Sequence, residues 1–227
     1  DIYAAALSCL VEDELDLGCT ILDMGAMTTS IGVVLDGKLV FADAVPVGGL
    51  HITQDIARGL TTPVNQAERL KTLHGHAIRN ARDESDMIDV PQIGEEERTH
   101  GHMVPRSFLT GIIQPRVEEI FELVRNRLEA SGFSSTTGRR VVLTGGASQL
   151  SGLRELATIM LDKQIRIASP QKISGLAEST SGPAFATACG LLLYASEHAH
   201  EIPDIAIPGA ITGGMFSRLT HWVRENW

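Results

Sequence analysis

Two glycine-containing turns, each directly after an apolar run, hold the residues best suited to binding chemistry. The first turn contains Asp23, Gly25, Thr28 and Thr29. Its backbone amides and threonine hydroxyls can surround a phosphate. Asp23 can hold a magnesium ion through water, because Mg²⁺ keeps much of its hydration shell beside phosphates. The same residue types also form an ordinary hydrogen-bonded turn, so the motif alone leaves both interpretations open.

The second turn contains Gly145, Gly146 and Ala147. Paired glycines between a strand and a helix let the backbone approach a flat or charged ligand, although a tight strand-to-helix connection explains them equally well. A further pair, Glu68 and Lys71, lies close to one helical turn apart, so both side chains share one face of a predicted helix. A plain surface ion pair is the alternative interpretation of that pair.

Short strands and helices must position these turns. Residues 19–23 form an apolar run that predicts a buried strand ending at the first turn. A hairpin is predicted next, because residues 31–35 and 39–45 flank Asp36-Gly37, a dipeptide that favours a type I′ turn with positive φ at both central residues. Gly48-Gly49 then breaks the strand.

The remaining pattern alternates between helices and strands, which indicates an α/β domain. Pro115 should kink or restart a helix over 107–130, since proline removes a backbone donor. Residues 75–105 predict a small lobe of strands and loops, with the acidic run at 95–97 on a solvated face. The other predicted elements are helices over 52–60, 64–73, 153–161 and 184–196, and strands over 140–144 and 165–168.

Residues 215–227 have the pattern of a short amphipathic helix, with apolar side chains gathered on one face. Its aromatic rings suit the boundary between lipid headgroups and acyl chains, and its arginines can meet anionic headgroups. The helix is therefore predicted to lie in a membrane surface, the alternative being that it docks on its own domain or on a partner. The predicted membrane-binding residues are Met215, Phe216, Arg218, Leu219, Trp222, Val223, Arg224 and Trp227.

Composition excludes some classes of protein. The 227 residues are 43% hydrophobic and carry a formal net charge of −9. A nucleic-acid-binding protein is not expected, because phosphate contacts need clustered Lys and Arg. Cys9, Cys19 and Cys189 lack CxxC spacing, and we expect small buried thiols in a reducing compartment. The absence of a signal-peptide pattern predicts a cytoplasmic location, and the start at Asp1 suggests a piece of a longer protein.

In this order, with a hairpin after the first, the two turns resemble the second phosphate loop and the adenosine loop of the actin, Hsp70 and sugar-kinase superfamily. Within it, the chain resembles the FtsA family of bacterial cell-division proteins over almost its whole length. The segments that carry this resemblance are Val45-Pro46-Val47-Gly48-Gly49, Thr53-Gln54-Asp55-Ile56-Ala57, Ala67-Glu68-Arg69-Leu70-Lys71, Val141-Val142-Leu143-Thr144-Gly145-Gly146-Ala147 and the amphipathic end.

The resemblance implies an α/β fold: the C-terminal, actin-like (ribonuclease H-like) half of such a protein, with a small inserted lobe and a C-terminal amphipathic helix. Residues 1–47 and 107–197 would form the nucleotide-binding subdomain, and 48–106 the inserted lobe. Residues 198–214, which contain several prolines and glycines, would be a flexible linker to the membrane-targeting helix at 215–227.

The resemblance also implies a function. The protein would bind ATP with magnesium, polymerise, and tether FtsZ filaments to the cytoplasmic face of the inner membrane at the division septum. Its partners would be the C-terminal peptide of FtsZ, bound in the lobe around 49–106, further copies of itself, anionic lipids and later division proteins. By position, Asp23, Gly25, Thr28 and Thr29 would meet phosphate and magnesium, Glu68 and Lys71 the ribose and base, and Gly145, Gly146 and Ala147 the adenosine.

Three residues depart from the family pattern. The phosphate loop of the family is commonly richer in glycine, whereas this chain has Ala26 and Met27, and Ser30 replaces a frequent acidic residue. Bulkier side chains restrict the approach of the backbone to phosphate, so we expect at most a weak ATPase. The resemblance also implies that the other half of the protein supplies the first phosphate loop and the residues for the attacking water, so this half alone is not expected to be active. Two alternatives remain: the C-terminal half of a soluble sugar or acetate-type kinase, and an interaction module that binds no nucleotide.

Overall fold

The computed structural model describes residues 1–94, 102–133, 138–171, 173, 175 and 177–198. Residues 1–194 pack into one compact unit, and a second unit begins at Ala195. The predicted membrane helix at 215–227 and nearly all of the predicted linker lie outside the described residues.

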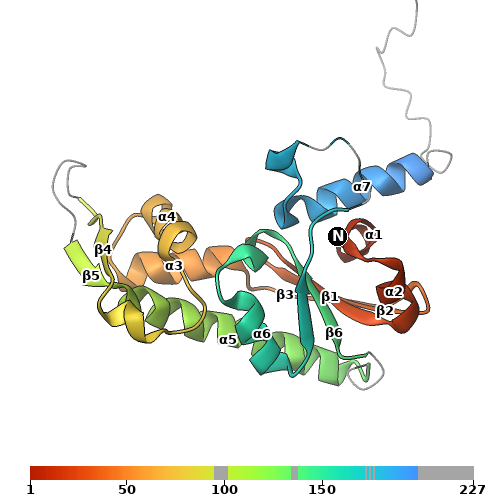
Figure 1. Cartoon of the computed structure of the whole chain (residues 1–227), viewed down its shortest axis with the longest axis horizontal. Coiled ribbons are helices and arrows are strands. Elements are labelled where there is room, and N and C mark those ends of the chain that lie inside the picture. The colour runs from red at the N-terminus through yellow and green to blue at the C-terminus, as the bar shows by residue number, and fades with distance from the viewer. Residues whose placement is uncertain (95–101, 134–137, 172, 174, 176, 199–227) are drawn as a thin grey trace, which may run out of the picture. The chain divides into compact units, whose positions relative to one another are not determined.

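A five-stranded mixed sheet forms the centre of the first unit (Figure 1), with the strand order β3-β2-β1-β6-β7. Strands β1 (Cys19–Met24), β2 (Thr29–Leu35) and β3 (Lys38–Val45) form an antiparallel meander. Strands β6 (Arg140–Thr144) and β7 (Gln164–Ile167) extend the sheet parallel to β1. The predicted α/β class is therefore confirmed.

Both faces of the sheet are covered, because alternate residues of a strand point to opposite sides. On one face Leu22 and Met24 join a core with α3 (Gly49–Gly59), α5 (Arg106–Ala130) and α6 (Leu153–Leu161). On the other face Ile21 and Val142 pack with α1 (Ile2–Cys9) and the start of α7 (Ala186–Glu197). Helix α2 (Glu12–Leu17) leads from α1 into β1.

The predicted hairpin turn is confirmed. Asp36 and Gly37 connect β2 to β3 with φ values of 48° and 71°. Both angles are positive, as a type I′ turn requires, and the partners Leu35 and Lys38 face each other across it.

Two sequence expectations need correction. Helix α3 begins at Gly49, three residues earlier than predicted, so the glycine pair forms the start of the helix and not only a strand break. Helix α5 runs through Pro115 without restarting. The buried side chains of Ile113 and Val117 hold the turns on both sides of the proline in one core, which compensates for the lost backbone donor.

Between α3 and α5 lie α4 (Val64–His74), the short helix η1 (Ala81–Glu84) and an antiparallel hairpin of β4 (Met87–Val90) and β5 (His102–Pro105). The strands predicted within 75–105 are thus present, while a separate lobe over 48–106 stays a prediction. The remaining elements are the short helices η2 (Gly146–Gln149), η3 (Glu178–Thr180) and η4 (Pro183–Phe185).

Cys9, Cys19 and Cys189 are buried free thiols, as predicted. Burial raises the pKa of Cys9, and it raises the pKa of Cys19 to about 12. Within the described ranges, no helix combines the length and the apolar character needed to cross a bilayer.

Candidate functional site

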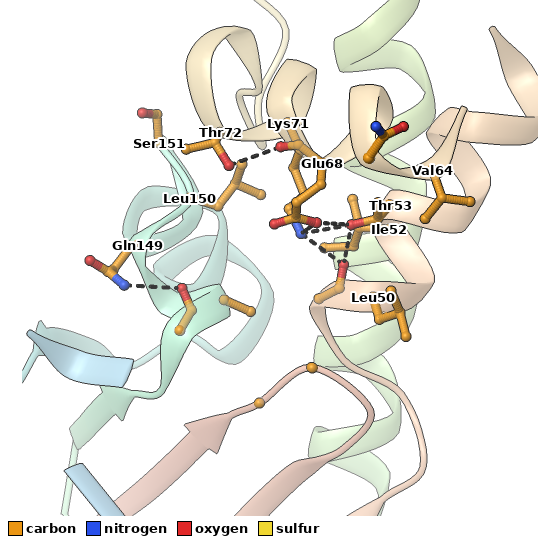
Figure 2. Close-up of a pocket in the computed structure, with 16 residues that line it drawn as sticks. Leu50, Ile52, Thr53, Val64, Glu68, Lys71, Thr72, Gln149, Leu150 and Ser151 are labelled. Carbon is orange, nitrogen blue, oxygen red and sulfur yellow. Dashed lines mark hydrogen bonds and ion pairs between the residues drawn. The ribbon is translucent and has the colours of Figure 1, made fainter. Parts of the chain in front are cut away.

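A cleft of about 740 Å³ opens beside the two predicted turns (Figure 2). One wall comes from α3 and α4, and the other from η2 and the residues that follow it. The floor includes the turn between β1 and β2. The lining residues are Gly25, Ala26, Gly49, Leu50, Ile52, Thr53, Val64, Asn65, Glu68, Lys71, Thr72, Gly146, Ala147, Gln149, Leu150 and Ser151.

The first turn is joined directly to the start of α3. The amide of Gly49 donates to the carbonyl oxygen of Gly25 at 2.9 Å, and the amide of Leu50 donates to that of Ala26 at 2.8 Å. A Cβ at Gly48 would lie 2.5 Å from the Gly25 oxygen and 2.8 Å from the Ala26 oxygen, so only glycine fits this close approach. The helix start thereby fixes the position of the turn on the floor of the cleft.

Lys71 on α4 holds the wall of the cleft together. Its ammonium group donates to the carbonyl oxygen of Gly49 at 3.0 Å, to Oγ1 of Thr53 at 2.8 Å and to Oε2 of Glu68 at 2.8 Å. The Thr53 hydroxyl also donates to Glu68 Oε2 at 2.5 Å. The Lys71 side chain is only 14% exposed, so the pair is more than the surface ion pair of the alternative interpretation.

The Glu68 carboxylate is held in its charged form. Burial by itself would raise its pKa, but the hydrogen bonds from Lys71 and Thr53, together with the lysine charge, outweigh burial and lower the pKa. The wall therefore presents a fixed carboxylate, 52% exposed, beside an anchored ammonium group. Such a pair can accept and donate hydrogen bonds to a ligand with hydroxyl groups.

Behind the opposite wall, Gly145 directly follows β6 with a φ of 86°, a region that favours glycine. A Cβ at Gly145 would overlap Oδ1 of Asp23, so the strand end of β1 and the second turn are in close contact. The Ser148 hydroxyl donates to the carbonyl oxygen of Gly145 at 2.7 Å and closes η2. The two predicted turns therefore meet where the parallel strands β1 and β6 end.

The structure brings together five of the nine predicted nucleotide-contacting residues, since Gly25, Glu68, Lys71, Gly146 and Ala147 all line the cleft. The other four, Asp23, Thr28, Thr29 and Gly145, are not among the lining residues that the structure describes.

These four residues shape the base of the site. The buried hydroxyl of Thr29 donates to the carbonyl oxygen of Val47 at 2.9 Å. The carbonyl oxygen of exposed Thr28 accepts from the amide of Gly25 at 2.9 Å. Asp23 Oδ2 accepts from the hydroxyl of Thr187 at 2.6 Å. Their direct contact with phosphate or magnesium stays a prediction.

Several residues that line the cleft were not predicted from the sequence. Val64, Glu68 and Thr72 are spaced four residues apart on α4. This spacing places the three side chains on one helix face. Because Glu68 is a predicted contact residue, the spacing could have indicated Val64 and Thr72 as its neighbours in the site. Gln149 and Ser151 belong to the other wall, where the amide nitrogen of the Gln149 side chain donates to the carbonyl oxygen of Gly146 (Figure 2). No local pattern pointed to these two, because their place depends on the pairing of β1 with β6.

Among the described residues, no cluster of three His, Cys, Asp or Glu side chains is arranged to hold a metal ion. Magnesium beside phosphates needs only one or two carboxylates, because water and the phosphates supply the other ligands. Asp23 is half-buried at the end of β1, next to both turns. Its donor chemistry and position fit such an ion.

Comparisons with known proteins agree with the fold. MreB5 of Spiroplasma citri bound to ADP superposes with a TM-score of 0.67 at 18% identity, covering 89% of this chain and 60% of that one. A PilM-PilN type IV pilus biogenesis complex gives a TM-score of 0.60 at 22% identity, covering 85% and 50%. These similarities confirm the predicted actin-like fold.

Sequence relatives agree on the family. Cell division protein FtsA of Agrobacterium fabrum is 46% identical over 235 residues, and those of Neisseria meningitidis and Escherichia coli K12 are 35% and 32% identical. Each alignment covers 99% of this chain but only 52% to 55% of the relative, so the chain spans about half the length of these curated relatives. The family model described as "Cell division protein FtsA" matches residues 20–190. The match does not favour the soluble-kinase alternative, and the chain belongs to the FtsA family of cell-division proteins.

Proposed function

We propose that this chain supplies the ATP-contacting cleft of an actin-like division protein that tethers FtsZ filaments to the membrane. The observation that carries the nucleotide part is the cleft itself. In it, Glu68 and Lys71 on α4 face the glycine turn of Gly146 and Ala147 across a space of about 740 Å³. A flat base can lie against the glycine turn, while the charged pair meets the ribose hydroxyls.

The solved relatives support the choice of ligand. MreB5 of Spiroplasma citri has been solved with ADP and with AMPPNP, and the second structure has a TM-score of 0.65 at 18% identity. In this chain, the phosphates would reach the turn at Gly25 and Ala26, at the floor of the same cleft. Asp23 would hold magnesium through water, and the ion would offset the negative charge of the phosphates.

Two features favour weak binding of the phosphates. The amide of Gly25 is already bonded to the carbonyl oxygen of Thr28, and the side chains of Ala26 and Met27 stand exposed on the turn. Both features limit how many backbone amides can converge on one phosphate. We therefore propose at most a weak ATPase, acting as a switch or assembly factor more than as a rapid enzyme.

The membrane and filament parts of the proposal rest on the family and on the sequence of the tail. Residues 215–227 would lie in the cytoplasmic face of the inner membrane at the septum, held by aromatic and arginine side chains. The C-terminal peptide of FtsZ, further copies of the protein and later division proteins would be its partners. A polymer of such subunits would multiply the weak membrane affinity of one short helix.

A titration with a fluorescent ATP analogue tests the nucleotide part. It should be done on this chain and on a protein of the relatives' full length that contains it. Lys71→Met should raise the Kd about tenfold, because it removes the anchored cation and frees Glu68. Lys38→Met is the matched control, since Lys38 is exposed at the hairpin turn away from the cleft. If neither wild-type protein binds the analogue, the nucleotide-free interaction module becomes the better interpretation.

Flotation on liposomes that contain anionic lipids tests the membrane part. The full chain should float with the vesicles, and the chain without residues 215–227 should stay at the bottom. Replacing Arg218 and Arg224 with glutamine should weaken flotation most at low salt, where attraction to the headgroups is least screened. Equal failure of the full and shortened chains to float would argue for a tail that docks on protein.

A further inference from the structure

Thr187 reaches the first turn from a distant part of the chain. It is the second residue of α7, and its hydroxyl donates to Oδ2 of Asp23 at 2.6 Å. The bond joins the end of β1 to a helix on the other face of the sheet. A hydrogen bond to a charged oxygen is about twice as strong as one between neutral groups.

The second oxygen of Asp23 is confined as well. Oδ1 lies against the backbone of Gly145, where a Cβ would overlap it. The carboxylate is thus held on one side by a hydroxyl from α7 and on the other by the turn that follows β6. Two elements remote in sequence therefore contact this carboxylate, one at each oxygen.

The start of α7 is itself fixed in place. The buried hydroxyl of Ser8 on α1 donates to the carbonyl oxygen of Ala186 at 2.7 Å. Four residues further on, a Cβ at Gly190 would overlap the carbonyl group of Ala4, so the helices touch backbone to backbone. Figure 1 shows α1 and α7 lying side by side. Thr187 therefore presents its hydroxyl from a rigid support.

We infer that Thr187 is a positioning residue for Asp23 and sets the part of nucleotide affinity that depends on magnesium. This inference rests on the proposed function. A carboxylate already oriented loses less conformational freedom when it takes up the hydrated ion. Without the hydroxyl, Asp23 rotates more freely, and the gain in affinity that magnesium provides becomes smaller.

The experiment measures the Kd of a fluorescent ATP analogue in EDTA and in magnesium. The readout is the Kd in EDTA divided by the Kd in magnesium, which is the gain in affinity that magnesium provides. Thr187→Val keeps the shape of the side chain but removes the donor, and it should lower the magnesium-dependent ratio about tenfold. Thr187→Ser keeps the donor and should retain most of the ratio. In an Asp23→Asn background, Thr187→Val should have no further effect on it.

Ser8→Ala is the matched control, because it removes a buried hydrogen bond to the neighbouring residue Ala186 without touching Asp23. A ratio that falls as much in Ser8→Ala as in Thr187→Val would assign Thr187 to the seating of α7 and overturn the inference. An unchanged ratio in a folded Thr187→Val, or in Thr187→Ala should the valine variant not fold, would also overturn it. In that case intact analogue binding leaves the proposed function standing, whereas a wild-type protein that binds no analogue at all defeats the proposed function itself.

Discussion

The hydrogen bonds of the Lys71 side chain both join two helices and fix the position of a charged group at the cleft. Its ammonium group bonds to the first turn of α3 and to Glu68 on its own helix. Because the group is mostly buried, each of these acceptors helps to offset the cost of removing the charge from water. The arrangement places a negatively charged oxygen at the edge of the cleft whether or not a ligand is present.

Stability should depend on the charge of Glu68 at acidic pH. Its folded-state pKa is lowered from the ordinary value of 4.5, so its contribution is present above about pH 4.5 and is lost as the pH falls through the folded pKa. The side chain is half exposed, so the contribution should be below about 1 kcal/mol. Urea unfolding of the wild type and of Glu68→Gln should show a difference at pH 7 that shrinks towards pH 3.

The same comparison in a Lys71→Met background provides the control. Without the lysine, the difference between Glu and Gln at position 68 should be small at both pH values. A pH-dependent difference that persists there would assign the effect to another group.

Among contacts between helices and strands, the ion pairs of Glu14 attach α2 to the parallel strands β6 and β7. Its carboxylate is 5% exposed and accepts from two nitrogens of Arg166 on β7, at 2.8 Å and 2.6 Å. Arg140 on β6 approaches it at 3.3 Å. Three elements are thus joined by one buried charge.

Removing that charge should be costly. Glu14→Leu leaves Arg166 without its ionic partner, and we expect the free energy of unfolding to fall by about 2 kcal/mol, a value reduced because both arginines are partly exposed. The double variant Glu14→Leu with Arg166→Leu should be more stable than Glu14→Leu alone, since the partly buried charge of Arg166 is then removed together with its partner. Urea unfolding of both single variants and the double variant measures this, and strictly additive losses would contradict it.

Two glycines, one in the hairpin turn and one inside a helix, test how backbone conformation affects stability. Gly37 has a φ of 71° and open space where a Cβ would point, so Gly37→Ala should cost about 1 kcal/mol through its backbone alone. Gly111 lies inside α5, where a Cβ would meet only the flexible end of Arg79 at 3.0 Å. Gly111→Ala should therefore stabilise the protein by up to about 1 kcal/mol. The same substitution should change unfolding free energy in opposite directions at the two positions, as urea titration can show.

At the scale of the whole molecule, all residues that line the cleft belong to the compact unit 1–194. A ligand that binds the folded state raises the melting temperature with its concentration. ATP with magnesium should therefore raise the melting temperature equally in the full chain and in a chain without residues 215–227. A shift that disappears with the tail would show that the nucleotide acts elsewhere.

The sequence was most informative where a requirement is local. Asp36-Gly37 predicted its turn because two adjacent residues need positive φ, and Gly145 has the positive φ and the close contact with Asp23 that favour glycine at this position. The buried position of Glu14 and the bond from Thr187 to Asp23 had no local signal, because both depend on contacts more than 150 residues apart. Pro115 does not restart the helix, one of the two outcomes that the sequence suggested, because buried side chains on both sides of it pack into one core.

The order of the strands also bears on the time at which the cleft can form during translation. The meander of β1, β2 and β3 can pair as soon as Val45 has left the ribosome, since its contacts are local. The glycine turn of the opposite wall follows β6, and it is complete only after the chain has been made beyond Ala147. A nascent chain that has been made past Lys71 but not yet to Gly146 therefore lacks the second wall, and a ligand that contacts both walls can stabilise only the later, longer chain.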